Sequence, residues 1–198
     1  MNWYEDEIRQ LEKKIQTQSP DNKPVVFYGS SSIRLWDKLT EDFPLCTSLN
    51  LGFGGSTLAA CTWFFERVVV PARPSSLILY AGDNDLGDNR HPEEVYLFFC
   101  AFSDKVQQYF PAIPFTYLSV KASPARWHNA GNIRRTNDLI RGKTGEFPNY
   151  FFVDMFTPML NDAGQPRREL FEADGLHLNR KGYELWRDVL TQHPHIFS

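Results

Sequence analysis

Short apolar runs alternate with longer amphipathic stretches along most of this chain, and this alternation restricts the possible folds more than any other feature. Each apolar run spans five or six residues, which is too short for a helix, and none shows the strict polar alternation of a half-exposed strand. Strands covered on both faces have this composition. The sequence therefore predicts five buried parallel strands, at residues 24–28, 45–49, 76–80, 115–120 and 150–155.

Amphipathic segments separate the predicted strands. Apolar residues between positions 4 and 15 recur at helical spacing, which predicts an opening helix that ends before the turn formers of residues 19–22. The strand–helix alternation predicts an α/β fold, a three-layer α/β/α sandwich around an open parallel sheet with right-handed crossovers. Ligands bind at the carboxyl ends of the strands in such sheets. The later helices are expected at 32–39, 57–70, 92–110, 132–141 and 179–192, the last with Asn179 as N-cap.

Length and charge exclude several classes of function. The 198 residues contain no internal repeat, low-complexity run or long linker, so we expect a single domain over residues 1–198. The net charge of -3 and the lack of a dense Lys/Arg cluster argue against nucleic acid as a partner. The start of the chain is acidic and polar, unlike a signal peptide, and no apolar stretch approaches the roughly 20 residues that span a bilayer. We expect a cytoplasmic protein without stable membrane insertion.

Hydroxyl side chains follow the first predicted strand directly, in the segment Gly29-Ser30-Ser31-Ser32. At a strand-to-helix turn the backbone N–H groups are free and the helix dipole favours negative charge. A nucleophile or a bound anion suits this position. Serine is also a common helix cap, so the segment by itself leaves both interpretations open.

Three glycines follow the second predicted strand, at positions 52, 54 and 55. They permit close backbone approach and leave a main-chain N–H pointing outward. A phosphate-binding loop is the competing interpretation. It is disfavoured because Ser56 and Thr57, not a lysine, follow the last glycine, and because the order of the glycines is not GxGxxG.

The third predicted strand is followed by Gly82-Asp83-Asn84-Asp85. The Asn84 amide is a neutral N–H donor of the kind that stabilises a developing oxyanion, although these residue types also form ordinary turns. Asp83, Asp85 and Asp88 alternate loosely, but they do not follow the order of an EF-hand calcium loop. We therefore expect neither a metal ion nor another cofactor.

A carboxylate and an imidazole lie three residues apart before the last predicted helix, in Asp174-Gly175-Leu176-His177. This spacing lets one loop hold the carboxylate against Nδ1 of the imidazole while Nε2 faces a hydroxyl across the site. A single DxxH motif is common by chance, so its weight comes from its combination with the other segments.

The four segments, in this order along nearly the whole chain, resemble the four sequence blocks of the SGNH/GDSL hydrolase superfamily. The resemblance implies a flavodoxin-like sheet and the activity of a serine esterase or acylhydrolase. By position in the motifs, it implies Ser31 as nucleophile, His177 as base and Asp174 as the residue that orients His177. It also implies an oxyanion hole formed by the N–H groups of Ser31 and Gly55 and by the Asn84 amide.

One residue departs from the family pattern, because the first block usually reads Gly-Asp-Ser and this chain has Ser30 in place of the aspartate. Ser32 consequently remains a rival nucleophile. Ser31 is preferred because it keeps the motif's spacing from Gly29 and because Ser32 suits the first position of the helix. The α/β-hydrolase elbow, Gly-x-Ser-x-Gly, is not present, since Ile33 stands where its second glycine would be.

The expected function is the hydrolysis of carboxylic esters of small molecules, lipids or acylated sugars through an acyl-enzyme intermediate, with a small-molecule ester as the binding partner. The alternatives are a ligand-binding protein that keeps the fold without turnover, and a phosphoryl-handling enzyme that uses the glycine loop. Residues 121–131 and 157–169 are long enough to be pocket walls. Arg126, Trp127 and His128 either line the pocket or decorate the surface.

Overall fold

The computed structural model describes residues 1–19 and 21–197, and it confirms the expected α/β fold. Five strands form one parallel sheet in the order β2-β1-β3-β4-β5, which is the flavodoxin-like order. No helix in the described part of the chain is both long and apolar enough to cross a membrane. The strands are β1 (Val25–Gly29), β2 (Ser48–Gly52), β3 (Ser76–Tyr80), β4 (Phe115–Leu118) and β5 (Tyr150–Val153).

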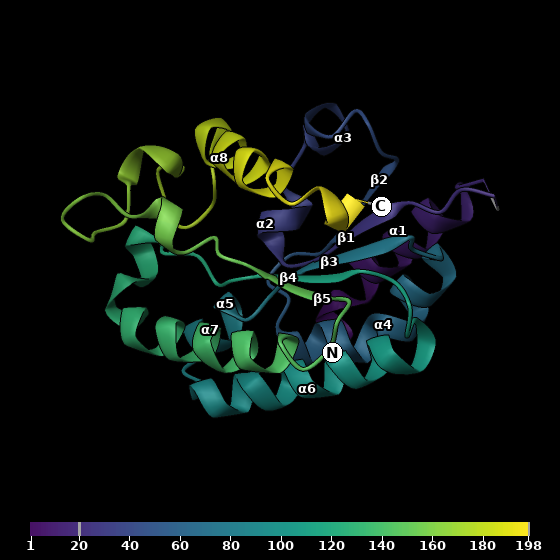
Figure 1. The fold of residues 1–198 in the computed structure, drawn as a ribbon, viewed down its shortest axis with the longest axis horizontal. Coiled ribbons are helices and arrows are strands. Elements are labelled where there is room, and N and C mark those ends of the chain that lie inside the picture. The colour runs from purple at the N-terminus through teal and green to yellow at the C-terminus, as the bar shows by residue number, and fades with distance from the viewer. Residues whose placement is uncertain (20, 198) are drawn as a thin grey trace.

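Helices cover both faces of the sheet, as the three-layer prediction requires (Figure 1). One layer holds α1 (Glu5–Gln16), α4 (Leu58–Ala72), α6 (Pro92–Tyr109) and α7 (Ala130–Thr144). The other holds α2 (Ser31–Arg34), α3 (Leu39–Asp42) and α8 (Arg180–Thr191). A short helix, α5 (Asp83–Gly87), follows β3. The other described helices are short 3₁₀ segments: η1 (Asn2–Tyr4), η2 (Pro124–Asn129), η3 (Thr157–Met159), η4 (Arg168–Leu170) and η5 (Pro194–Phe197).

Strand β1 shows why its residues lack polar alternation. Phe27 points into one layer, where its ring lies 5.9 Å from that of Trp36, and Tyr28 points into the other, 6.2 Å from the ring of Phe102. Both side chains are fully buried. Because successive side chains of a strand point to opposite faces, a strand covered on both sides must be apolar throughout.

The predicted second strand was wrong in its bounds, 45–49 instead of Ser48–Gly52. Leu45, taken as its apolar start, is 100% exposed and belongs to the turn after α3. The real strand lies at the edge of the sheet, and Ser48 and Asn50 are only partly buried. An edge strand accepts polar side chains, so the most apolar window did not coincide with it.

The helix predicted at 32–39 is two short helices, α2 and α3, separated by an irregular segment. Asn50 donates a hydrogen bond to the carbonyl of Ile33 at 2.6 Å, and so occupies an acceptor that a continuing helix would use. The polar segment after β3, which could also have been an ordinary turn, forms the short helix α5 from Asp83.

The remaining helices lie within three residues of their predicted bounds. The Asn179 side chain accepts a hydrogen bond from the N–H of Gly182 at 3.2 Å, which confirms the predicted N-cap of α8. Helix α1 ends at Gln16, before the expected turn at 19–22, of which Pro20 lies outside the described residues.

Candidate active site

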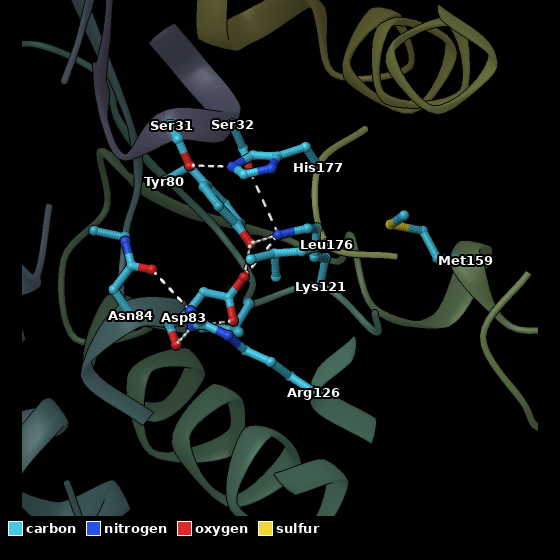
Figure 2. Close-up of polar contacts among 12 residues, drawn as sticks. Ser31, Ser32, Tyr80, Asp83, Asn84, Lys121, Arg126, Met159, Leu176 and His177 are labelled. Carbon is cyan, nitrogen blue, oxygen red and sulfur yellow. Dashed lines mark hydrogen bonds and ion pairs between the residues drawn. The ribbon is translucent and has the colours of Figure 1, made fainter. Parts of the chain in front are cut away.

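The loops that follow β1, β2 and β3 meet at one edge of the sheet, because these strands are parallel neighbours. They carry Ser31, Gly55 and Asn84 respectively. The end of β1 requires glycine, since a Cβ on Gly29, at φ +134°, would lie 1.9 Å from the carbonyl oxygen of Tyr80 on β3. The loop before α8 brings His177 to the same edge (Figure 2).

A chain of hydrogen bonds joins the three residues of the expected triad. The Ser31 hydroxyl lies 3.1 Å from Nε2 of His177, and Nδ1 of His177 donates to Oδ2 of Asp174 at 2.6 Å. The serine is half-buried and reachable from solvent. With its Nδ1 proton held by a carboxylate, the imidazole presents its lone pair to the hydroxyl, an arrangement that can activate a nucleophile.

Asp174 is held as an ionised acceptor by its own loop. Its Oδ1 accepts hydrogen bonds from the N–H of Leu176 at 2.9 Å and of His177 at 3.0 Å. These bonds and the contact with the His177 ring lower the pKa of the Asp174 carboxyl to about 2. The carboxylate therefore stays charged throughout the neutral range, and it can keep the imidazole in one tautomer.

The structure distinguishes the three serines after β1 by their surroundings. Helix α2 begins at Ser31 rather than at Ser32, so the expectation that Ser32 occupies the first helical position was wrong. Ser30, which replaces the usual aspartate, is buried at the N-cap position. Ser32 is also buried, 2% exposed, and its Oγ faces the ammonium of Lys121 at 3.4 Å instead of the imidazole.

The three expected oxyanion donors lie on the segments that follow β1, β2 and β3. The backbone N–H groups of Ser31 and Gly55 make no hydrogen bond to any other described residue. Gly55 is exposed in the left-handed region at φ +65°, where glycine is favoured. The Asn84 amide donates one N–H to the carbonyl of Ser56 at 3.0 Å, and its second N–H remains available. Such donors suit a developing oxyanion.

Side chains from two distant elements hold the loop that contains Gly55. Tyr4, in η1, donates to the Gly55 carbonyl at 2.9 Å, and the Glu7 carboxylate in α1 accepts from the Gly54 N–H at 2.9 Å. Both peptides that flank the Gly54–Gly55 peptide are therefore tethered, which restricts the direction of the Gly55 N–H. Sequence reasoning missed this clamp, because its partners lie about fifty positions apart and share no motif.

A buried ionic cluster lies beneath the site (Figure 2). Lys121 donates to the Asp83 carboxylate at 2.7 Å and to the Tyr80 hydroxyl at 3.1 Å, and Arg126 contacts the same carboxylate at 2.9 Å. Burial raises the pKa of Asp83, but the two cations outweigh it and hold that pKa below its usual range. Both cations come from the segment 121–131, which the sequence marked only as a pocket wall.

Among the described residues, no hydrogen bond or ring contact joins Trp127 or His128 to Ser31, Asp174 or His177. The Trp127 ring stacks on that of Phe156 at 6.2 Å, and His128 is exposed. In the second expected wall, Thr157 and Leu160 line a separate cavity beside α7.

Asp85 is a buried carboxylate next to the expected oxyanion residue. Its Oδ2 accepts from the N–H of Leu58, at the start of α4, at 2.9 Å, whereas Oδ1 finds no partner among the described residues. Burial raises the pKa of Asp85 to about 6. The Asp85 carboxyl therefore keeps its proton to a higher pH in the folded chain than in the unfolded chain, where an aspartate ionises at about pH 4.

We expect Asp85→Asn to raise the free energy of unfolding at pH 8 by about 1–3 kcal/mol. Between about pH 4 and pH 6 the wild type should lose stability as the pH rises, because the unfolded chain ionises first and the folded chain must then ionise a buried group. Asparagine keeps the acceptor for Leu58 without the charge. Urea denaturation at a series of pH values measures the free energy of unfolding. If this free energy changed equally with pH in the wild type and in Asp85→Asn between about pH 4 and pH 6, the prediction would be contradicted.

A cavity of about 480 Å³ opens beside His177, between the segment after α2 and the start of α8. Its walls combine apolar and charged side chains: Leu35, Asp37, Lys38, Glu172, Leu178, Arg180 and Tyr183. Of the expected site residues, His177 lines this cavity.

Comparison with solved structures shows the same fold in many proteins. A protein from Streptococcus pneumonia, provisionally named a platelet activating factor, is 22% identical, with a TM-score of 0.80 over 97% of this chain and 94% of that one. A GDSL-like lipase from Bacteroides thetaiotaomicron is 18% identical, with a TM-score of 0.73 over 93% and 95%. The SGNH-hydrolase family esterase AlinE4 is 19% identical, with a TM-score of 0.62 over 88% and 96%.

Family membership rests on the sequence of most of the chain. No curated protein matches it. The model of the GDSL-like Lipase/Acylhydrolase family, however, matches residues 21–185, which include all four expected motifs. The resemblance inferred from the motifs is thereby confirmed. The chain belongs to the GDSL-like lipase/acylhydrolase family and is an ester-hydrolysing enzyme.

Proposed function

We propose that this enzyme cleaves carboxylic esters through an acyl-enzyme on Ser31, with His177 as general base and acid and Asp174 as its orienting carboxylate. The observation that carries the proposal is the continuous chain from the Ser31 hydroxyl to Nε2, and from Nδ1 to the ionised Asp174. Ser32, the rival nucleophile, faces an ammonium group that cannot accept its proton.

In the first half-reaction, Oγ of Ser31 attacks the ester carbonyl carbon while its proton moves to Nε2 of His177. The carbonyl π electrons move to oxygen, and the N–H groups of Ser31 and Gly55 with the Asn84 amide hold the resulting oxyanion. When the carbonyl re-forms, the bond to the alcohol oxygen breaks, and that oxygen takes the proton from His177. The acyl group remains bonded to Ser31.

In the second half-reaction, a water molecule takes the place of the alcohol. His177 accepts a proton from the water as its oxygen attacks the acyl carbon, and the same three donors hold the second oxyanion. Collapse breaks the bond between Oγ and the acyl carbon, and His177 returns the proton to Oγ. The products are the carboxylic acid and free Ser31.

The cavity beside His177 supports a proposal for the substrate class. Its volume of about 480 Å³ admits a small or medium-sized group. Four of its lining side chains are charged, Asp37, Lys38, Glu172 and Arg180, so its rim favours a polar group over a long aliphatic chain. We therefore propose esters of short acyl groups with polar small-molecule alcohols.

The test of the proposed function is covalent labelling combined with hydrolysis. The protein is incubated with a fluorophosphonate, the adduct is located by tandem mass spectrometry, and hydrolysis of p-nitrophenyl acetate and butyrate is followed in parallel. We expect one adduct, on Ser31, and loss of hydrolysis in proportion to labelling. An adduct on Ser32 would contradict the assignment of the nucleophile, and a protein that neither labels nor hydrolyses either ester would overturn the proposed function.

The clamp on the glycine loop gives a separate prediction. Tyr4→Phe removes the donor to the Gly55 carbonyl while keeping the ring in its buried place. We expect kcat to fall about 3- to 10-fold with little change in KM, because the Gly55 N–H acts on the oxyanion and not on the bound ester. Steady-state kinetics with p-nitrophenyl acetate measures kcat and KM of the variant and the wild type.

Tyr109→Phe is the matched control, since Tyr109 lies at the C-terminal end of α6 and is 37% exposed. It should leave kcat unchanged. If Tyr4→Phe raised KM and left kcat intact, the hydroxyl would not be positioning an oxyanion donor.

A further inference from the structure

Arg126 contacts the Asn84 amide at its oxygen. The guanidinium extends from η2, after β4, and its Nη2 donates to Oδ1 of Asn84 at 3.1 Å (Figure 2). The other end of the same amide, Nδ2, donates to the Ser56 carbonyl at 3.0 Å. Each end of the carboxamide thus has a partner of the opposite hydrogen-bonding character.

These two contacts define a single orientation of the amide. A guanidinium is only a donor, so it accepts the oxygen end of Asn84 and repels the nitrogen end. Rotation of the amide by 180° would leave two donors facing each other at Arg126 and two acceptors facing each other at Ser56. The N–H that serves an oxyanion is therefore directed by a residue that does not itself border the hydroxyl.

The guanidinium is held in turn by the buried cluster. Its Nη1 donates to both the carboxylate and the backbone carbonyl of Asp83. Lys121 shares that carboxylate at 2.7 Å, so the Asp83 carboxylate is held by two cations and fixes the guanidinium beside Asn84. A donor bonded to the oxygen of an amide also polarises its N–H groups, which strengthens their hydrogen bonds.

Gly87, at the end of α5, leaves the space that the guanidinium occupies. A Cβ at this position would lie 2.6 Å from Cζ and Nη1 of Arg126 and 2.8 Å from Nη2. Any other residue would displace the guanidinium from Asn84 and Asp83. Position 87 is exposed and free of positive φ, so alanine is compatible with its backbone.

We propose that Arg126 is a positioning residue for the oxyanion hole: it orients and polarises the Asn84 amide, and Gly87 keeps its place open. This inference rests on the proposed function, since it concerns the oxyanion of the Ser31 reaction. It predicts an effect on kcat and not on KM, because the amide bonds the charge that develops in the transition state.

The test compares Arg126→Ala, Asn84→Ala and the double variant with p-nitrophenyl acetate. We expect kcat to fall about 10- to 100-fold in Arg126→Ala and about 10²- to 10³-fold in Asn84→Ala, with KM within about twofold of the wild type in both. In the double variant, loss of Arg126 should cost less than about twofold further, because it acts through Asn84. Millimolar guanidinium should restore part of the activity of Arg126→Ala and none of that of Asn84→Ala.

Gly87→Ala provides an independent variant that leaves every polar group in place. It should lower kcat about 3- to 30-fold in the wild-type background and have no effect in Arg126→Ala, where no guanidinium remains to displace. Arg135→Ala is the control, since Arg135 in α7 forms an exposed ion pair with Glu93 in α6. Thermal denaturation of each variant verifies that it is folded.

The outcomes separate the inference from the proposed function. If the wild type labels on Ser31 and hydrolyses the ester while folded Arg126→Ala and Gly87→Ala retain full kcat, the inference is overturned and the proposed function stands. Losses that multiply in the double variant, or a change in KM alone, would also overturn it. A wild type without labelling or hydrolysis would overturn both.

Discussion

Replacing Ser31 with alanine is expected to lower kcat for p-nitrophenyl acetate by about 10⁶-fold, to the level left by the oxyanion donors and binding alone. The hydroxyl that forms the covalent bond is lost, and no neighbouring group can take its role, because Ser32 is buried and faces Lys121. Fluorophosphonate labelling should disappear in the same variant. Stability should change little, since the side chain is half-buried and, among the described residues, its hydroxyl bonds only His177.

Ser32→Ala is the control that the chain itself offers. It removes a hydroxyl one position away, on the same short helix, and leaves the Lys121–Asp83 ion pair intact. We expect kcat within about threefold of the wild type, with labelling still on Ser31. A reversal, in which Ser32→Ala abolishes turnover and Ser31→Ala does not, would shift the nucleophile by one residue.

His177→Ala is expected to lower kcat by a similar factor, about 10⁶-fold, because the Ser31 hydroxyl then has no base within reach. The combination of His177→Ala with Ser31→Ala should be no slower than either single variant, since the two groups act as one unit. Steady-state kinetics of the three variants, with active-site titration to exclude traces of wild type, measures this.

His128→Ala is the matched control, since His128 is exposed on η2. It should retain the kcat of the wild type. A His177→Ala variant that kept more than about 1% of wild-type kcat would show that another group accepts the proton, and the general-base assignment would fail.

Much of the fold was predictable because it depends on local sequence. Residues 76–80 form β3 with the predicted bounds, since a central strand is buried on both faces and its apolar run is unmistakable. The bounds of the edge strand β2 were not predicted correctly. Its polar residues Ser48 and Asn50 fit a half-exposed strand, and the apolar Leu45 belongs to a turn. Periodicity reports burial, and it is weakest where burial is incomplete.

The same division applies to the site. Asp174 and His177 lie three residues apart in one loop, so their contact could be inferred from spacing. Ser31 could be inferred from its motif, but its distinction from Ser32 depends on which side chain points to the imidazole and which into the core. The rotation of roughly 100° between consecutive residues at the start of α2 decides this, and the sequence of neighbouring serines does not show it.

The layers of the fold, the family and the four segments that line one edge of the sheet can be inferred from the sequence, because these depend on interactions within a few residues and on motif spacing. How the proposed oxyanion donors are held depends on tertiary contacts: Tyr4 in η1 and Glu7 in α1 bond Gly55 and Gly54, and Arg126 bonds Asn84 from beyond β4. The physical reason is that a hydrogen bond between residues some forty to fifty positions apart depends on how packed elements align, and such alignment leaves no periodic trace in a single chain.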